Sequence, residues 1–176
     1  MWNKIKKYLH LIFIKYFGII IIPLFVLDLV TKAVMEKVLG GVAGETIPLI
    51  PNLFDFQLVY NTGSFSGWLG GDVGHIVLIL ISLLGGVGLI YLLIKYRNKF
   101  NLGMNIGLAL CIPGDLGNLV DRCFYTKDGP RGVIDFLHFY IPSLKFDWPV
   151  FNVADICLVA GVITFAVFYL VYDHKM

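Results

Sequence analysis

Residues 76–94 read IVLILISLLGGVGLIYLLI and contain no charged side chain. A helix needs about 20 mainly apolar residues to cross the hydrocarbon core of a bilayer, so this stretch is long enough to span a membrane. The rest of the chain has the same character, because 58% of its 176 residues are hydrophobic and only 15% are charged. Soluble domains have about 45–50% apolar and about 25% charged residues. The sequence therefore predicts a polytopic helical membrane protein.

Three more apolar stretches flank this one, at approximately residues 9–35, 102–121 and 150–172. Each is long enough to cross a bilayer. Together with residues 76–94 they predict a membrane all-α fold with four transmembrane helices, in a single integral-membrane domain that covers residues 1–176. Pro23 is expected to kink the first helix, because proline removes a helical hydrogen bond and clashes with the preceding turn.

Basic residues are concentrated at the two ends of the chain and in the segment 95–101, which follows the charge-free stretch. These parts hold eight of the 14 basic residues but one of the 12 acidic residues. Because cytoplasmic loops carry the excess of Lys and Arg, we expect both termini and this segment in the cytoplasm. Residues 36–75 and 122–149 then lie on the outer side of the membrane.

Two aspartates lie in short polar islands at the outer ends of the expected spans. Asp121 belongs to GNLVDR at residues 117–122, and Asp155 belongs to FNVAD at residues 151–155. A carboxylate in hydrocarbon costs about 2.5–3.5 kcal/mol on insertion scales, so such a residue is a candidate for a functional site. Two carboxylates at one depth can share a proton, and then one activates a water while the other polarises a carbonyl group. This is the chemistry of aspartic proteases, which requires no metal and no cofactor.

Each of the two aspartates also has a structural explanation. Asn152 and Asp155 are three residues apart just after Pro149, a spacing that resembles a helix N-cap with its capping-box acid. Asp121 and Arg122 could form a surface ion pair at the end of a span. The shared depth of the two aspartates favours the catalytic interpretation over two separate structural ones.

Three further charged residues in the apolar stretches need partners. Asp28 and Lys32 are four residues apart on one helical face, so we expect an ion pair that makes both tolerable in a membrane. Asp115 lies deeper in the third stretch, on the face that carries Arg122 two turns later. A structural pair with Arg122 or Asn118 and a catalytic role are both compatible with its position.

One face of the third stretch is small and polar, whereas the opposite face is apolar. Small residues allow a neighbouring helix or a substrate to approach closely. The small and polar face consists of Gly107, Cys111, Gly114, Asp115, Asn118, Asp121 and Arg122.

The outer segments contain two candidate strands and one candidate flap. In residues 56–60, which read FQLVY, Phe, Leu and Tyr alternate with Gln and Val, and this pattern predicts a short strand. Residues 132–136, which read GVIDF, are the second candidate. The glycine-rich segment 61–71 suits a mobile flap. Tyr60, Trp68 and Trp148 fit the aromatic belt of a membrane interface.

The remaining polar side chains carry weaker signals. The four histidines are scattered near span ends or in loops, so we expect no ligand or base role for them. Cys111, Cys123 and Cys157 lack metal-ligand spacing and are interpreted as packing residues. The net charge of +2 is too small to indicate a nucleic-acid partner, and no basic patch is interleaved with aromatics.

Five short motifs, in order along nearly the whole chain, resemble those of bacterial lipoprotein signal peptidase, also called signal peptidase II. They read DLVTK at residues 28–32, YNTG at 60–63, LGNLVDR at 116–122, GVIDF at 132–136 and WPVFNVAD at 148–155. The resemblance implies an aspartyl endopeptidase in the bacterial cytoplasmic membrane, with its active site near the outer face. Its partners would be membrane phospholipid and prolipoprotein signal peptides, which it cuts just before a cysteine that carries a diacylglyceryl group.

The resemblance also implies roles for individual residues and one further structural feature. Asp121 and Asp155 match the catalytic pair, and the family adds a small extracytoplasmic β-cradle. The polar residues around the pair match at Asn118, Arg122, Asn152, Asn61, Asp28, Lys32 and Asp135.

The chain departs from the family pattern in two places. Pro113, Gly114 and Asp115 stand where the family usually has two glycines and an alanine. After YNTG the family usually has two small residues before an aromatic one, whereas here Ser64 leads directly to Phe65, so the flap is expected to be one residue shorter.

Two other functions are compatible with the sequence. A small proton-coupled membrane transporter would use its acids as a relay, but it predicts acids near the bilayer midplane and a repeat symmetry that the chain lacks. A catalytically impaired relative of the peptidase family would account for Pro113 and Asp115.

Overall fold

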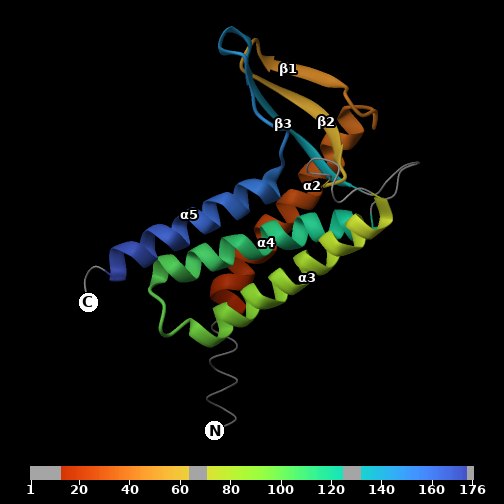
Figure 1. Cartoon of the computed structure of the whole chain (residues 1–176). Coiled ribbons are helices and arrows are strands. Elements are labelled where there is room, and N and C mark those ends of the chain that lie inside the picture. Colours follow the sequence, from red (N-terminus) through yellow and green to blue (C-terminus); the bar gives the residue numbers. More distant parts are fainter. Residues whose placement is uncertain (1–12, 64–70, 125–131, 174–176) are drawn as a thin grey trace.

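The computed structural model of the chain describes residues 13–63, 71–124 and 132–173. The helices form a bundle, and a small sheet stands at one end of it, next to the end of α2 (Figure 1). In chain order the elements are η1 (Phe13–Ile21), α2 (Ile22–Val38), β1 (Thr46–Ile50), β2 (Phe54–Asn61), α3 (Gly71–Tyr96), α4 (Leu102–Phe124), β3 (Val133–Ile141), η3 (Pro142–Leu144), β4 (Phe146–Asp147) and α5 (Val153–Asp173).

Three helical segments are long and apolar enough to cross a membrane, namely Lys15–Val38, Val73–Tyr96 and Val153–Val171. They correspond to η1 with α2, to α3 and to α5, so the protein is a mostly helical multi-pass membrane protein with a small antiparallel sheet. The span expected at residues 102–121 forms α4, but this helix does not meet the same measure of length and hydropathy. The reason is its many small and polar residues, which lower its hydropathy.

The helix α4 is the most enclosed element of the bundle. It contacts η1, α2, α3 and α5, and most of its length from Gly103 to Asp121 is buried. The outer helices instead expose large apolar side chains, such as Leu84 of α3 and Val159 of α5. The polar residues of α4 are therefore shielded by its neighbours, which makes them tolerable in an apolar surrounding.

Glycines bring α4 and α5 into backbone contact. A Cβ added at Gly107 would lie 2.6 Å from the backbone nitrogen of Phe165, and one at Gly114 would lie 2.5 Å from the carbonyl oxygen of Ala154. From the other helix, a Cβ at Gly161 would lie 2.7 Å from the carbonyl oxygen of Gly107. The glycines of the predicted small face of α4 therefore form the surface on which α5 packs.

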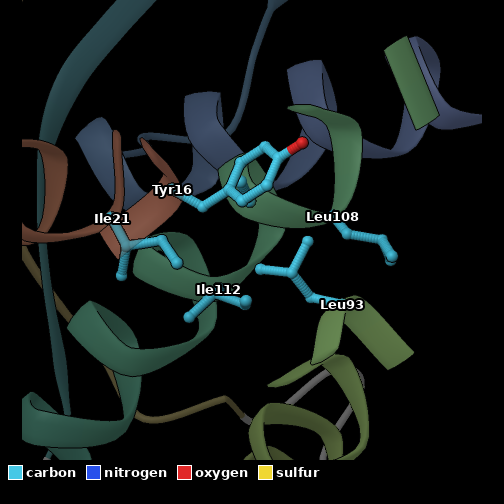
Figure 2. Close-up of a cluster of buried hydrophobic side chains, with 6 residues drawn as sticks. Tyr16, Ile21, Leu93, Leu108 and Ile112 are labelled. Carbon is cyan, nitrogen blue, oxygen red and sulfur yellow. The ribbon is translucent and has the colours of Figure 1, made fainter. Parts of the chain in front are cut away.

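A second contact joins η1, α3 and α4 through buried apolar side chains. Tyr16 and Ile21 of η1 meet Leu93 of α3 and Leu108 and Ile112 of α4 (Figure 2). On the side of η1 and α3, α4 packs through apolar side chains. On the side of α5, its glycines allow the two helix backbones to come into contact.

The prolines in α2 and α4 have different effects. The π geometry of η1 ends at Ile21 and α geometry begins at Ile22, so Pro23 lies in the first turn of α2, where proline is well tolerated. The proline that was expected to kink the first helix thus lies where the helix type changes. Pro113 lies inside α4 and is fully buried, and the helix continues through it to Phe124.

The sheet is antiparallel, with the strand order β1-β2-β3-β4. The strand predicted at residues 56–60 lies within β2, and the one predicted at 132–136 forms the first part of β3, so both are confirmed. Met35 of α2 and Leu39, which follows the end of α2, pack against Leu58 of β2 and against Ile134 and Phe136 of β3. This hydrophobic cluster fixes the sheet to the end of α2.

His138 connects three strands of the sheet. Its Nδ1 lies 2.9 Å from Asp55 Oδ1 in β2, and its Nε2 lies 2.8 Å from Asp147 Oδ1 in β4. Burial lowers the pKa of His138, but its hydrogen bonds with Asp147 and Asp55 outweigh this effect and raise the pKa above the ordinary value of 6.5. The His138 side chain therefore joins β3 to β2 and to β4.

The segment predicted to be a flap, residues 61–71, lies largely outside the described residues, and so does Trp68. Its beginning is a tight turn, in which the Gly63 N–H donates a 2.9 Å hydrogen bond to Asn61 Oδ1. Gly63 has a φ of 73°, a left-handed conformation that glycine adopts without strain.

Candidate active site

Lys32 of α2 binds acidic and amide groups from two helices. Its Nζ lies 2.8 Å from Asp28 Oδ2 and 2.7 Å from Asp121 Oδ2, and it donates a 3.0 Å hydrogen bond to Asn118 Oδ1. Only 1% of Lys32 is exposed. The ion pair predicted for Asp28 and Lys32 is confirmed, and the same cation also binds Asp121 across the α2–α4 contact.

Asp28 links α2 to the first turn of α5. Its Oδ1 accepts a 2.8 Å hydrogen bond from the Ala154 N–H. A side chain at Gly117 of α4 would collide with the Asp28 carboxylate, so the glycine leaves room for it. Three helices, α2, α4 and α5, therefore meet at this carboxylate.

Asp121 is buried and faces α2 and the sheet. Besides Lys32, its Oδ2 accepts a 3.2 Å hydrogen bond from the Ile134 N–H at the start of β3. The interpretation of Asp121 and Arg122 as a surface ion pair is wrong, because Asp121 is 6% exposed and its carboxylate binds Lys32.

Asp155 combines the two roles that the sequence left open. Its Oδ2 accepts a 3.1 Å hydrogen bond from the Asn152 N–H, while Asn152 Oδ1 accepts a 2.9 Å hydrogen bond from the Asp155 N–H. This reciprocal pair is the predicted capping box of α5. The other oxygen, Oδ1, accepts a 2.9 Å hydrogen bond from Asn118 Nδ2. Capping therefore orients the carboxylate and leaves one of its oxygens directed at α4.

Asn118 connects Asp155 to Lys32, which is itself a partner of Asp121. Its Oδ1 accepts hydrogen bonds from Lys32 Nζ and, at 3.1 Å, from Asn152 Nδ2, while its own amide nitrogen donates to Asp155. Lys32 in turn contacts Asp121. The chain of contacts from Asp121 to Asp155 thus passes through one lysine and one amide.

Asp135 of β3 is a hydrogen-bond partner of Asn152. Its Oδ1 accepts a 2.6 Å hydrogen bond from Asn152 Nδ2, and its Oδ2 accepts a 2.9 Å hydrogen bond from Asn61 Nδ2. Burial raises the pKa of Asp135 to about 7, although the hydrogen bond from Asn61 lowers it in part. Asp135 is thus a buried acid of the sheet whose protonated form is favoured by burial.

These side chains form one connected group, which we call the carboxylate network. It consists of Asp28, Lys32, Asn61, Asn118, Asp121, Asp135, Asn152 and Asp155. The structure brings together eight of the nine residues that the sequence selected. They come from α2, α4, α5 with its preceding residue Asn152, and the sheet, and they lie where the sheet meets the bundle.

The carboxylate network holds more acids than bases. It contains the carboxylates of Asp28, Asp121, Asp135 and Asp155, and Lys32 is its only cation among the described residues. A carboxyl group serves as a general base when it is ionised and as a general acid when it is protonated, so a site with several carboxyl groups offers groups for both roles.

Arg122, the ninth selected residue, faces α3. Its Nη1 donates a 3.1 Å hydrogen bond to Ser82 Oγ, and its carbonyl oxygen lies 2.8 Å from His75 Nε2. Ser82 was not among the residues predicted to belong to the site. Its hydroxyl within the otherwise apolar run of residues 76–94 was the available signal.

Among the described residues, no group of three or more His, Cys, Asp or Glu side chains is arranged so that it could hold a metal ion. The polar groups of the network are bound to one another by hydrogen bonds and ion pairs instead.

Buried carboxylates on several helices of a multi-pass bundle, beside a small antiparallel sheet, are an arrangement that suits a membrane enzyme. Residues 20–171 match the model of the family described as signal peptidase (SPase) II, and the chain belongs to this family.

Similar proteins agree with this assignment. A lipoprotein signal peptidase of Clostridium novyi is 38% identical over 152 residues, which cover 86% of this chain and 95% of that protein. One from Maridesulfovibrio salexigens is 34% identical and covers 92% of this chain and 99% of its own length. A solved structure of a bacterial membrane enzyme has a TM-score of 0.70 and 28% identity, and covers 87% of this chain and 85% of its own.

Proposed function

We propose that the chain is an intramembrane aspartyl endopeptidase that removes signal peptides from diacylglyceryl-modified prolipoproteins, cleaving before the lipidated cysteine. Its relatives are named lipoprotein signal peptidases, and the chain spans most of their length. The observation that carries the mechanism is the path from Asp121 through Lys32 and Asn118 to Asp155. Two carboxylates from α4 and α5 are thereby oriented by one buried set of partners.

In the proposed mechanism, Asp121 and Asp155 hold a water molecule between them. One carboxylate takes a proton from the water as it attacks the carbonyl before the lipidated cysteine, and the protonated partner donates a hydrogen bond to the developing oxyanion. Asn118 orients Asp155 through its amide, and the capping box fixes the rotamer of Asp155. Lys32 fixes the position of Asp121.

We also propose the arrangement of the chain in the bacterial cytoplasmic membrane. The whole chain forms one integral-membrane domain, with α4 as a fourth span that η1, α2, α3 and α5 shield from lipid. Both termini and the segment 95–101 are cytoplasmic, and the sheet lies outside as a small cradle. The distribution of Lys and Arg supports this orientation. The carboxylate network then lies near the outer face, where water reaches it.

The proposed substrates follow from this placement. The apolar signal helix of the prolipoprotein enters from the bilayer, and its acyl chains stay among the phospholipids. Large apolar side chains exposed on α3 and α5, such as Leu84 and Ile163, provide a surface that suits lipid and an apolar helix.

The first prediction concerns the two aspartates. The purified protein is expected to cut a diacylglyceryl-modified prolipoprotein peptide immediately before the modified cysteine, as read by mass spectrometry. Asp121→Asn and Asp155→Asn should each lower kcat by about 10²–10⁴-fold, because each removes a proton-transfer group. Glu45→Gln, an exposed acid outside the network, serves as the control and should retain the wild-type rate. Wild-type cleavage rates in both aspartate variants would refute the mechanism.

A further inference from the structure

Asp135, near the start of β3, is a buried acid with an amide group at each of its carboxylate oxygens. Its Oδ1 accepts a 2.6 Å hydrogen bond from Asn152 Nδ2, and its Oδ2 accepts a 2.9 Å hydrogen bond from Asn61 Nδ2. Only 1% of Asp135 is exposed, and Asn152 is fully buried. The contact with Asn152 therefore lies away from water, where a hydrogen bond is electrostatically stronger than in water.

Three acceptors surround the amide nitrogen of Asn152, which has two N–H bonds to donate. Besides Asp135 Oδ1, they are Asn118 Oδ1 at 3.1 Å and the Ile134 carbonyl oxygen at 3.3 Å. Asp135 is the nearest of the three. An amide oxygen in the same place would face these acceptors without a donor. The three acceptors therefore decide which end of the Asn152 amide is directed at the sheet and at α4.

The other end of the Asn152 amide holds Asp155. Asn152 Oδ1 accepts a 2.9 Å hydrogen bond from the Asp155 N–H, and the Asn152 N–H donates a 3.1 Å hydrogen bond to Asp155 Oδ2. If the amide turned over, its nitrogen would meet the Asp155 N–H, and two donors would face each other. The acceptor at Asp135 thus favours the amide orientation in which the capping box forms and orients the Asp155 carboxylate.

The same part of β3 also contacts the other aspartate of the pair. The Ile134 N–H donates a 3.2 Å hydrogen bond to Asp121 Oδ2, and the Ile134 carbonyl oxygen accepts from Asn152 Nδ2. Packing of the sheet against the end of α2 holds β3 in this place. Two consecutive residues of one strand therefore contact Asp121 directly and Asp155 through Asn152.

We propose that Asp135 is a positioning residue that acts through Asn152 on Asp155, so that the sheet, and not the helices alone, sets the geometry of the catalytic pair. The inference rests on the proposed function, in which Asp155 is one of the two catalytic aspartates. Loss of the Asp135 carboxylate should reduce the fraction of the protein in which Asp155 is correctly oriented. It should therefore lower kcat and leave KM unchanged.

The first test compares two substitutions of Asp135 in the cleavage of the lipidated peptide. Asp135→Ala removes both acceptor oxygens and should lower kcat by about tenfold at an unchanged KM. Asp135→Asn keeps one oxygen that can accept from Asn152, so its kcat should lie between those of Asp135→Ala and the wild-type protein. A wild-type kcat in Asp135→Ala, or a raised KM at constant kcat, would overturn the inference.

Asp55 provides the control for a general loss of sheet stability. It is a buried acid of β2, and its Oδ1 lies 2.9 Å from His138 Nδ1. Asp55→Asn should lower the melting temperature in detergent, as Asp135→Ala does, but it should keep the wild-type kcat at a temperature well below melting. A loss of kcat in Asp55→Asn as large as in Asp135→Ala would reduce the role of Asp135 to sheet stability and overturn the inference.

The route through Asn152 is tested with Asn152→Ser. Serine is about as good an N-cap residue as asparagine, but it has no amide nitrogen to donate to Asp135. Asn152→Ser should therefore lower kcat at least as much as Asp135→Ala. In the Asn152→Ser background, Asp135→Ala should have no further effect on kcat, because the connection is already absent. A further loss of about tenfold in the double variant would contradict the proposed route.

Amide hydrogen exchange tests the positioning without turnover. The Asp155 N–H lies in the first turn of α5, where an N–H has no partner within the helix, and Asn152 Oδ1 is its acceptor. It should exchange faster in Asp135→Ala than in the wild-type protein, and at the wild-type rate in Asp55→Asn. Equal exchange in Asp135→Ala and the wild-type protein would overturn the inference. Failure of the wild-type protein to cleave would refute the proposed function, whereas the exchange comparison would still decide whether Asp135 maintains the capping box.

Discussion

At the scale of single residues, Lys32 has the largest influence on the charge balance of the site. It is almost fully buried and contacts Asp28, Asn118 and Asp121. Breaking a buried ion pair leaves an uncompensated charge, which costs about 3–5 kcal/mol. The position of Lys32 therefore makes the ionised form of at least one buried acid compatible with an apolar surrounding.

Asp135 gives the residue-scale prediction of pH dependence. Burial raises its pKa from 3.8 to about 7 in the folded protein. Between about pH 4 and about pH 7 the folded state binds more protons than the unfolded state, so stability falls as the pH rises through this window. Asp135→Asn cannot ionise and should lose this component.

Melting temperatures in detergent at about pH 5 and about pH 8 test this prediction. The melting temperature of the wild-type protein should decrease more between these two pH values than the melting temperature of Asp135→Asn. Glu45→Gln, at an exposed position, should follow the wild-type protein. Equal losses in wild-type and Asp135→Asn proteins would contradict the raised pKa.

At the scale of elements, the glycine contacts between α4 and α5 set the position of Asp155. A Cβ at Gly114 would lie 2.5 Å from the Ala154 carbonyl oxygen and 2.9 Å from the Leu158 nitrogen. Gly114→Ala should therefore push the first turn of α5 away, lower stability by about 1–3 kcal/mol and reduce kcat. Unfolding in detergent and peptide cleavage measure the two effects.

The same substitution at Gly88 is the matched control, because its Cβ meets nothing within 4 Å. Alanine has a higher helix propensity than glycine by about 1 kcal/mol, so Gly88→Ala should be neutral or slightly stabilising. If Gly114→Ala behaved like Gly88→Ala, the backbone contact between α4 and α5 would not be what fixes Asp155.

The sequence predicted many of these elements and their residues because local patterns encode them. The capping box at Asn152 and Asp155, the pair of Asp28 with Lys32 and the strand at residues 56–60 all depend on spacings of two to four residues. The contact of Lys32 with Asp121 was not predicted. It depends on how α2 rotates against α4, which long-range packing decides.

The wrong prediction for Asp121 and Arg122 and the omission of Ser82 also result from long-range packing, which local sequence patterns do not encode. Asp121 and Arg122 are adjacent in sequence, but on a helix they point about 100° apart, so one faces α2 and the other faces α3. Ser82 was passed over because nothing in an apolar run indicates which helix its hydroxyl will meet. The hydropathy of α4 is lower than that of the other long helices because of its small and polar residues, and its neighbours in the bundle bury most of these residues.

At the scale of the whole molecule, the proposed orientation places the sheet outside and the turn between α3 and α4 inside. Leu144→Cys, an exposed position beside the sheet, and Lys99→Cys, an exposed position in that turn, report the two sides. In a Cys123→Ser background, a membrane-impermeant maleimide should label Leu144→Cys in intact cells and Lys99→Cys only after lysis. The reverse pattern would invert the topology.

The central claim is that Asp121 and Asp155 act as one catalytic unit. The measurement that tests it most directly is the cleavage rate of the lipidated peptide by Asp121→Asn, Asp155→Asn and the double variant. Residues that act as a unit are non-additive, so the double variant should be no slower than the slower single variant, each single loss being about 10²–10⁴-fold. Losses that multiply in the double variant, or a single variant with the wild-type rate, would contradict the account.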